Sequence, residues 1–405
     1  MPLWWERNDL AYDSEGFLLF AGQRAADLAR ASGAPAFFYS RARALAKMQT
    51  IRSALDMAEL ARHTLFYAMK ANRFMPLLTG LAESRLCGVD VCSPAEITRA
   101  LACGFREEDI SFTGTSVSEA DLDIICRHPG IMLNCDSQSM LRRVAARKVF
   151  RRVGLRINPA IGVGYGNNQL LAYSGKATTK FGIYAEQFDE TIRLAGKLGL
   201  EITRIHFHTG CGYLRDQLPV FENILKECAA FIAKLPGIEA INIGGGLGVR
   251  LTESDRELDL DEWAAVIKRQ LGDFHAEIHA EPGDAIIKDA GILVLEVNTV
   301  EKKKDTLFVG VNGGFNIACE PAYYSMPSEV APLCLRAPKE EAYAKCVPVT
   351  IAGNINEALD IWYRDIPLPE LREGDKIALL NSGGYAGAMS SNHCMRGAFT
   401  ERLLL

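Results

Sequence analysis

The sequence lacks any apolar run near the roughly 20 residues needed to span a bilayer. Its first residues, Met1 to Arg7, lack the charged-then-apolar order of a secretory signal peptide. None of its 11 cysteines belongs to a CxxC pair, and no cluster of cysteine and histidine has the spacing of a zinc site. Most of these cysteines lie inside apolar stretches, which is typical of reduced, buried thiols. We therefore expect a cytoplasmic protein without a membrane contact, a disulfide framework or a bound metal.

The sequence also has little excess charge of either sign. Its 45 lysine and arginine residues are balanced by 50 aspartate and glutamate residues, for a net charge of -5. This balance gives no support to a general nucleic-acid-binding protein. The longest basic run, Lys302-Lys303-Lys304, is followed at once by Asp305 and is typical of a solvated turn. The 48% of hydrophobic residues is in the range of globular proteins, and a length of 405 residues fits two domains.

Between residues 60 and 285, short apolar runs alternate with longer amphipathic stretches. Apolar strands that alternate with helices predict a parallel sheet, and eight such units predict a closed (β/α)8 barrel of the α/β class. The eight predicted strands start near Thr64, Cys87, Ile110, Ile131, Arg152, Ile202, Ala240 and Glu277.

After residue 290 the helical pattern gives way to β-prone runs separated by turns, such as GILVLEVNTVEK and DKIALLNSG. These runs predict a C-terminal β-domain. The early run PAFFYS has the composition of one further strand for that domain. The predicted domains are therefore a barrel over residues 38–288 and a β-domain built from residues 1–37 and 289–405.

Residues that carry chemistry stand at the predicted C-terminal strand ends, where barrel enzymes place their active sites. Lys70 ends the first strand, Asp90 lies in the second, His208 ends the sixth and Glu281 ends the eighth. The seventh is followed by Gly244-Gly245-Gly246, whose N–H groups can hold a phosphate if a helix starts there. Each feature alone also has an ordinary structural explanation. The lysine can be solvated, the histidine can belong to the core, the glycines can form a tight turn, and Glu281 can cap the next turn. The combination of amine, phosphate loop, imidazole and carboxylate favours a catalytic site.

The lysine itself lies within FYAMKAN, between small and apolar residues. We expect such surroundings to lower the pKa of Lys70, so that its amine can form an imine. A carboxylate such as that of Glu281 can keep a pyridine nitrogen protonated, which makes a pyridoxal ring an electron sink.

The motifs FYAMKAN, VDVCSPAE, RINP, KFGI, HFHTG, GGGLG, EPG, ALD, GGY and SSN together resemble those of the alanine-racemase-fold decarboxylases. These fold type III enzymes include the diaminopimelate and eukaryotic-type ornithine decarboxylases, and the resemblance covers nearly the whole chain. It implies decarboxylation of an α-amino acid through a Schiff base and a quinonoid of pyridoxal 5'-phosphate. It also implies a head-to-tail homodimer with two shared active sites. Glu281 favours decarboxylation, because racemases of this fold tend to place arginine on the pyridine nitrogen.

The resemblance also implies a role for each matching residue. Lys70 would form the internal aldimine, His208 would stack on the cofactor ring, and Glu281 would pair with the pyridine nitrogen. The amides of Gly244, Gly245 and Gly246 would hold the phosphate. The other cofactor-binding positions would be Asp90, Cys211 and, from the partner subunit, Tyr385.

Other matched positions concern the substrate and the subunit contact. Asp360 matches an acidic residue that the partner subunit offers to the far end of the substrate. Lys180 in KFGI matches a lysine that makes a contact between subunits. The predicted substrate-binding positions are Asp284, Glu320, Tyr324, Glu357 and Asp360.

Four positions depart from the family motifs. Asn356-Glu357 replaces a cysteine–glutamate pair, and asparagine cannot donate a proton as an acid near neutral pH. Asn356 therefore occupies a catalytic position, but Lys70, a tyrosine or water would have to donate in its place. Cys211 replaces a serine and is a weaker donor toward phosphate. Asp284 replaces the arginine of EPGR, and Glu320 replaces an arginine that would bind a distal carboxylate.

These acids shift the predicted substrate away from diaminopimelate. We expect a distal end that is cationic or neutral, as in lysine, ornithine, arginine or a conjugated amino acid of siderophore or other secondary-metabolite biosynthesis. The Gly-rich insertion over residues 161–180 would lie on the active face and either reshape the pocket or form a surface loop that touches nothing. Two other functions stay open, namely racemisation or other chemistry at Cα, and an inactive relative that regulates an active partner.

Overall fold

The computed structural model describes residues 2–60, 62–165, 168, 171, 173–175 and 177–405. Its contacts group the chain into two compact units. The barrel unit comprises Leu45–Val249 and Arg256–Ile286. The sheet unit comprises Met1–Ala44, Arg250–Asp255 and Ile287–Leu405.

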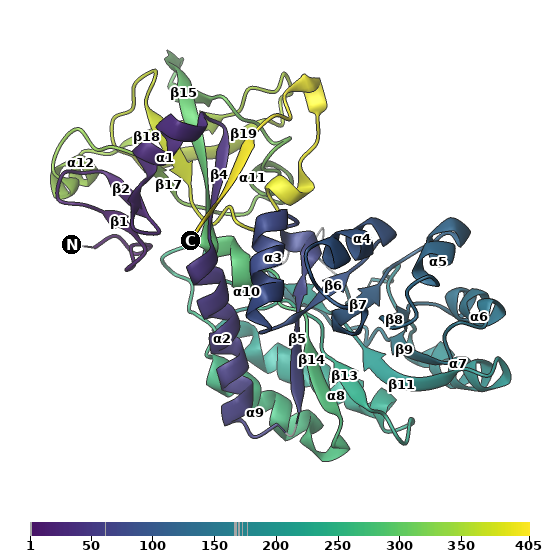
Figure 1. Ribbon diagram of the computed structural model, residues 1–405. Coiled ribbons are helices and arrows are strands. Elements are labelled where there is room, and N and C mark those ends of the chain that lie inside the picture. The colour runs from purple at the N-terminus through teal and green to yellow at the C-terminus, as the bar shows by residue number, and fades with distance from the viewer. Residues whose placement is uncertain (1, 61, 166–167, 169–170, 172, 176) are drawn as a thin grey trace. The chain divides into compact units, whose positions relative to one another are not determined.

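The barrel unit holds eight parallel strands closed in the order β11-β13-β14-β5-β6-β7-β8-β9 (Figure 1). The predicted (β/α)8 barrel is thus confirmed, and each strand lies where an apolar run predicted it. The strands are β5 His63–Ala68, β6 Gly88–Val91, β7 Ile110–Thr113, β8 Met132–Cys135, β9 Arg152–Arg156, β11 Glu201–His206, β13 Ala240–Asn242 and β14 Glu277–Ala280.

The helices of the barrel begin where the sequence supplies caps. The side chains of Ser93, Ser118, Ser137 and Asp259 accept hydrogen bonds from backbone N–H groups three residues on and so satisfy otherwise unpaired donors. The helices are α3 Met75–Ser84, α4 Pro94–Ala102, α5 Glu119–Ile125, α6 Gln138–Arg147, α7 Ala185–Lys197, α8 Leu218–Ile232 and α9 Leu260–Leu271. The chain enters the barrel through α2 Arg41–Met57 and leaves it through α10 Asp284–Ile287.

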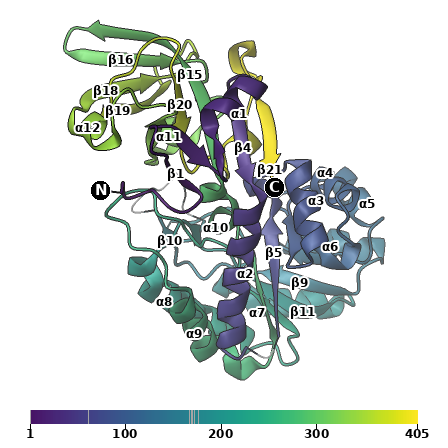
Figure 2. The ribbon, with the colours of Figure 1, turned by 60° about the vertical axis from the view of Figure 1, so that its left-hand side comes forward.

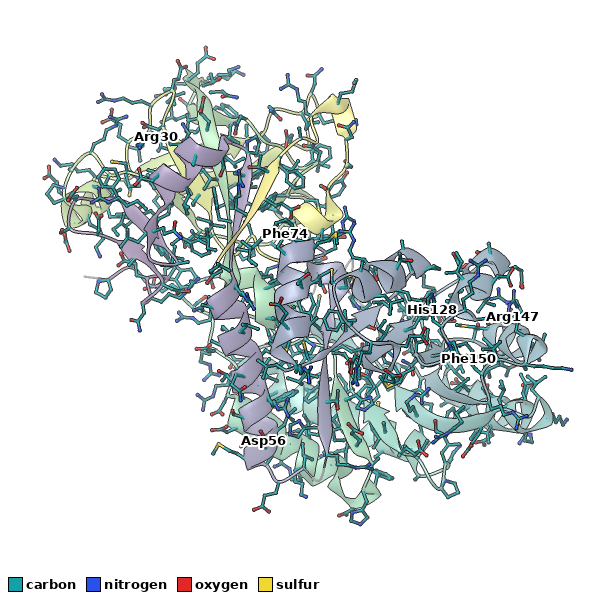
Figure 3. All side chains as sticks on the ribbon, viewed as in Figure 1. Arg30, Asp56, Phe74, His128, Arg147 and Phe150 are labelled. Carbon is teal, nitrogen blue, oxygen red and sulfur yellow. The ribbon has the colours of Figure 1, made fainter. Side chains whose placement is uncertain are left out.

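Neighbouring barrel helices are joined by surface ion pairs. Arg147 lies at the end of α6 (Figure 3). It donates to Glu119 at 2.7 Å and to Asp123 at 2.8 Å, both on α5. Such exposed ion pairs contribute little to stability, because water screens them. Short 3-10 turns in the barrel unit are η1 Met69–Ala71, η2 Glu107–Asp109, η4 Arg215–Gln217 and η5 Gly272–Phe274, and those in the sheet unit are η6 Lys288–Ala290, η7 Gly387–Met389 and η8 His393–Met395.

The sheet unit confirms the predicted β-domain. Its main sheet runs β17-β20-β15-β16-β18-β19, with β4 pairing β15 and β21 pairing β4 (Figure 2). These strands are β4 Ala36–Ser40, β15 Gly291–Lys303, β16 Thr306–Val311, β17 Val330–Pro332, β18 Val347–Ala352, β19 Ile361–Leu368, β20 Lys376–Leu379 and β21 Thr400–Leu404. The unit also contains β1 Leu10–Tyr12, β2 Leu18–Phe20, β3 Gln23–Arg24, α1 Ala25–Ser32, α11 Glu320–Tyr324 and α12 Lys339–Ala344.

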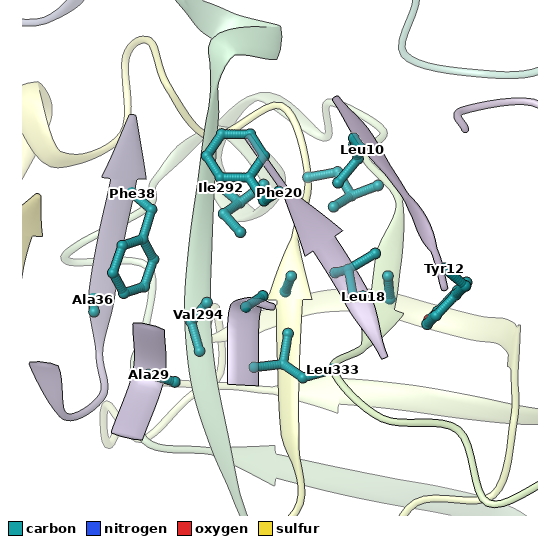
Figure 4. Packing of buried hydrophobic residues seen from close by; sticks show 14 of the residues in the cluster. Leu10, Tyr12, Leu18, Phe20, Ala29, Ala36, Phe38, Ile292, Val294 and Leu333 are labelled. Carbon is teal, nitrogen blue, oxygen red and sulfur yellow. The ribbon is translucent and has the colours of Figure 1, made fainter. Parts of the chain in front are cut away.

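The predicted boundary after residue 37 falls inside β4. Phe37 pairs with Leu293 and Phe38 with Ile292, so both belong to the same sheet. The sheet unit therefore extends through β4 into the first turn of α2. Its core is apolar, and Phe38 and Ile292 lie in one cluster with Phe20 and Leu10 (Figure 4).

None of the helices in the described part of the chain is long and apolar enough to cross a membrane. Within the same residues, no group of three histidine, cysteine, aspartate or glutamate side chains is placed to hold a metal ion.

Candidate active site

Lys70 lies in η1, directly after β5, at the C-terminal end of the barrel. Its Nζ atom donates to Oδ2 of Asp90 at 3.1 Å. Burial acts to lower the pKa of Lys70, but the carboxylates of Asp90 and Glu281 outweigh burial and raise it above its ordinary value. The prediction of a lowered pKa is therefore wrong, because the spacing within FYAMKAN carries no information about these two acids.

Asp90 is 2% exposed and receives Lys70 on one oxygen only. Its Oδ1 atom has no hydrogen-bond partner among the described residues. Burial and the nearby charge of Glu281 raise the pKa of Asp90, and Lys70 opposes that rise. A buried polar atom without a partner is costly, so this oxygen indicates a place where a further polar group fits.

Glu281 follows β14 and stands in a network of polar side chains from neighbouring strands. Its Oε2 atom lies 3.0 Å from Nε2 of His206, and Nδ2 of Asn242 donates to Oε1 at 2.7 Å. Burial acts to raise the pKa of Glu281, but His206, Lys70 and Asn242 hold it well below its usual range. Burial lowers the pKa of His206. The carboxylate of Glu281 is therefore held in its ionised form by its contacts with His206, Lys70 and Asn242.

The glycine loop packs against the segment that carries His208. The amide of Gly245 donates to Nδ1 of His208 at 3.3 Å. A Cβ atom at Gly244 would collide with the carbonyl of Phe207, and one at Gly245 would collide with the carbonyl of Glu281. This cradle therefore requires glycine. Burial and the cations of Lys70 and Arg156 hold the pKa of His208 well below its usual range, so its imidazole is neutral.

The described part of the 161–180 insertion contacts this cluster. Strand β10 (Val163–Gly164) pairs in parallel with β12 (Gly210–Cys211), which fixes the start of the insertion and includes Cys211. The hydroxyl of Tyr165 donates to Oδ2 of Asp284 at 3.2 Å. The ring of Tyr173 meets that of His208 edge-on, with centroids 4.7 Å apart. These two tyrosines therefore do not belong to a surface loop that touches nothing. Residues 166, 167, 169, 170, 172 and 176 of the insertion lie outside the described residues.

Sequence reasoning assigned no role to Arg156, although it noted the motif RINP. Arg156 ends β9 and is 7% exposed, with its guanidinium 4.6 Å from the ring centroid of Phe181. Its electrostatic partners include Glu281, Asp136 and Asp90. Its position at the C-terminal end of a predicted barrel strand was the signal that could have identified Arg156 as a site residue. Lys180, on the same segment as Phe181, lies over that ring at 5.3 Å.

The remaining predicted site residues belong to the sheet unit. Asn356 and Glu357 are exposed, and Glu357 lies 3.4 Å from Nε2 of His393. Asp360 is 3% exposed and accepts hydrogen bonds from the amides of Phe315 and Ile355 at 2.8 and 2.7 Å. The carboxylate of Asp360 thus holds its own loop together, and a substrate would have to compete with these bonds.

Glu320 and Tyr324 are the first and last residues of α11. The carboxylate of Glu320 is paired with a cation, because Nζ of Lys288 donates to both of its oxygens at 2.7 Å. The same Nζ lies 5.7 Å from the ring centroid of Tyr385, which has a left-handed φ of 53°. The inference that Glu320 would repel a carboxylate therefore needs correction, since Lys288 neutralises it.

The barrel residues fit a pyridoxal phosphate group by their chemistry. The cluster combines a partly exposed amine, an ionised buried carboxylate, a neutral imidazole and a loop of three positions that only glycine can occupy. The partnerless oxygen of Asp90 adds a polar contact in the same cluster.

Three comparisons with known proteins agree on one family. The model for "Pyridoxal-dependent decarboxylase, pyridoxal binding domain" matches residues 42–288. Diaminopimelate decarboxylase of Methanothermobacter thermautotrophicus is 33% identical over 408 positions, covering 98% of this chain and 92% of that protein. The crystal structure of diaminopimelate decarboxylase from Helicobacter pylori with L-lysine superposes with a TM-score of 0.81 at 27% identity, covering 94% of each chain. The arginine decarboxylase of Paramecium bursaria Chlorella virus, at 19% identity and a TM-score of 0.79 over 91% of this chain and 96% of that one, shares the fold.

Proposed function

We propose, on the premise that the chain belongs to the family of pyridoxal-dependent decarboxylases, that it removes the α-carboxylate of an amino acid whose distal end is cationic or neutral. The enzyme is a carbon–carbon lyase that uses pyridoxal phosphate. The observation that carries the proposal is the amine of Lys70 beside the buried carboxylates of Asp90 and Glu281 at the C-terminal end of the barrel.

Pyridoxal phosphate, when bound, supplies an aldehyde that reacts with amines and a ring that accepts the electron pair left by the departing carboxylate. Lys70 is the residue that would hold it covalently, and Asp90 can take the proton that the Lys70 amine must lose. Glu281, kept ionised by its neighbours, would stabilise a positive ring nitrogen.

The glycine loop would lie along the phosphate, although no helix in the described part of the chain starts there and the amides of Gly244 and Gly245 already donate to Asn242 and His208. The neutral imidazole of His208 would lie against the ring.

The substrate proposal rests on two acids. Asp284 is 6% exposed and stands in the barrel where EPGR would place arginine. Glu320 stands in the sheet unit where the motif of diaminopimelate decarboxylases has arginine, and Tyr324 follows on the same helix. Neither residue is itself the cation that would clamp a distal carboxylate, but Lys288 neutralises Glu320, so the preference against a distal carboxylate rests mainly on Asp284. Diaminopimelate itself is the second candidate, favoured by the names of the relatives at 29–33% identity.

The assembly proposal is a homodimer in which each barrel site is completed by the sheet unit of the partner. Tyr385 would reach the phosphate, and Asn356, Glu357 and Asp360 would approach the substrate. Because Asn356 cannot act as an acid, Lys70 would return the proton to Cα. A variant that stays monomeric would then lose activity although both of its units remain folded.

The test combines a spectrum with an assay. The purified holoenzyme should absorb in the violet region, and Lys70→Ala should abolish both that band and CO2 release. CO2 release is then measured from diaminopimelate, lysine, ornithine, arginine and amide-conjugated amino acids. Exchange of deuterium at Cα in D2O without CO2 would favour racemisation instead, and a protein that binds no pyridoxal phosphate would favour the regulatory alternative. Full activity in Lys70→Ala would refute the proposal.

A further inference from the structure

Arg156 brings a buried positive charge to the level of the barrel at which Glu281 finds its partners. In the parallel register of the strands, Arg156 on β9 lies beside His206 on β11, and His206 lies beside Asn242 on β13. Residues in register on neighbouring parallel strands point to the same face of a sheet. His206 and Asn242 both contact the carboxylate of Glu281 inside the barrel. The side chain of Arg156 therefore points inward as well.

The guanidinium of Arg156 has no hydrogen bond or ion pair among the described residues. It lies 4.6 Å from the ring centroid of Phe181, and three buried carboxylates act on its charge without accepting a hydrogen bond from it, namely Glu281, Asp136 and Asp90. Arg156 is 7% exposed, and its guanidinium is a permanent cation with several N–H donors. Because buried donors without an acceptor are costly, this side chain indicates a place for a further, negative acceptor.

Pyridoxal phosphate offers one such acceptor that the proposed function leaves unassigned. The aldehyde falls to Lys70, the ring nitrogen to Glu281 and the phosphate to the glycine loop. The oxygen on ring carbon C3 remains, and it is an acidic hydroxyl that can lose its proton. The carboxylate of Asp90 would repel this oxygen once it is negative, whereas the guanidinium of Arg156 attracts it.

We infer that Arg156 is a further cofactor-binding residue, whose guanidinium donates to the oxygen on C3 of the pyridoxal ring and keeps that oxygen negative. The inference rests on the proposed function, which supplies the ring. A negative oxygen there favours a proton on the nitrogen through which Lys70 would hold the ring. That proton strengthens the ring as an acceptor of electrons.

The α-carboxylate of the substrate is the other negative group that such a site receives. A cation fixed on that carboxylate would stabilise it in the ground state, although it is the group that has to leave without its charge. Arg156 would then oppose the reaction that the family performs. The oxygen on C3 keeps its place on the ring throughout, so a contact with Arg156 carries no such penalty.

Binding of two forms of the cofactor to the full-length chain tests the inference. Pyridoxal phosphate and 3-deoxypyridoxal phosphate differ in the oxygen on C3 alone, and their dissociation constants are measured by equilibrium dialysis. The wild type should prefer pyridoxal phosphate, and Arg156→Met should reduce this preference by about tenfold or more, as expected for a charge-assisted hydrogen bond. Arg204→Met is the matched control. It removes a barrel arginine that lines a cavity with Glu239 and Glu277, and it should leave the preference unchanged.

The absorbance of the bound cofactor gives a readout that a change in folding stability alone would not move. A negative oxygen on C3 beside a protonated nitrogen absorbs in the violet region, whereas a neutral hydroxyl moves the band to the near ultraviolet. Arg156→Met should move the band to the near ultraviolet at unchanged pH. Arg156→Lys, which keeps the positive charge, should retain the violet band.

Two results would overturn the inference. The first is equal affinity of the wild type for the two cofactor forms, which requires no variant to fold. The second is an Arg156→Met variant with an unchanged preference and spectrum, and Arg156→Gln gives the same comparison if the methionine variant does not fold. Failure to bind either form would refute the proposed function, whereas CO2 release combined with an unchanged preference would refute only the role of Arg156.

Discussion

Replacing Asn242 by aspartate gives the sharpest test of the buried network around Glu281. Asn242 ends β13 and is 3% exposed. Its Nδ2 atom donates to Oε1 of Glu281 at 2.7 Å, and its Oδ1 atom accepts from the amide of Gly244 at 2.9 Å. The Asn242→Asp variant keeps the shape but replaces the donor by a second carboxylate oxygen. The contact then survives only if one of the two acids holds a proton.

The cost of that proton can be worked out from the ordinary pKa of aspartate, about 3.9 in an unfolded chain. Above this pH the folded variant binds one proton more than the unfolded chain. Folding therefore raises the pKa of the carboxyl pair at positions 242 and 281. The free energy of unfolding of the variant then falls by about 1.4 kcal/mol for each pH unit as the pH rises. Between pH 5 and 8 the variant should therefore lose about 4 kcal/mol relative to wild type. Below about pH 4 this difference vanishes.

Urea unfolding of the wild type and of Asn242→Asp at pH 5, 6.5 and 8 measures the slope. Asn242→Ala is the matched control, since it loses both hydrogen bonds but adds no titrating group. It should show an offset of about 2–4 kcal/mol that does not change with pH. Parallel stability curves for the aspartate variant and the wild type would refute the contact with Glu281.

Two further predictions concern the glycine loop and the insertion. Gly245→Ala should lower stability by about 1–3 kcal/mol and weaken pyridoxal phosphate binding in equilibrium dialysis, because its Cβ would meet the carbonyl of Glu281. Gly196→Ala, in a helix with open space around the added methyl, should instead match or exceed wild-type stability by up to about 1 kcal/mol. Tyr165→Phe should cost about 1.5–3 kcal/mol in thermal unfolding by removing the bond to Asp284, and added to Asp284→Asn it should cost little more.

The barrel could be predicted because its strands are continuous apolar runs, a signal that survives in one sequence. Two features of the fold could not be predicted from the sequence. Strands β10 and β12 have two residues each and therefore no periodicity, so only their pairing across the fold reveals them. The run PAFFYS joins the β-domain as expected, but the boundary placed after residue 37 falls inside β4, because nothing in an apolar run shows at which residue its strand ends.

The site could be predicted as a set of strand-end residues but not as an electrostatic system. Lys70 and Glu281 were found from their motifs, whereas the direction of the pKa shift at Lys70 depends on Asp90, 20 residues away in sequence and 3.1 Å away in space. The same limit applied to Glu320, whose partner Lys288 lies 32 residues earlier. In both cases the neighbour that sets the charge comes from another element.

The raised pKa of Lys70 changes how its reactivity should be understood. A lysine that must attack a carbonyl has to be neutral, and burial alone would achieve this by expelling the proton. Here burial acts on Lys70 and Asp90 together, raising the pKa of the acid while Glu281 stays ionised beside them. The proton on the amine then has an acceptor 3.1 Å away whose own affinity for protons is raised. Because the pKa of Lys70 is raised as well, its amine holds this proton more tightly than a solvated lysine would, and Asp90 is the neighbouring group that can take the proton when the amine gives it up.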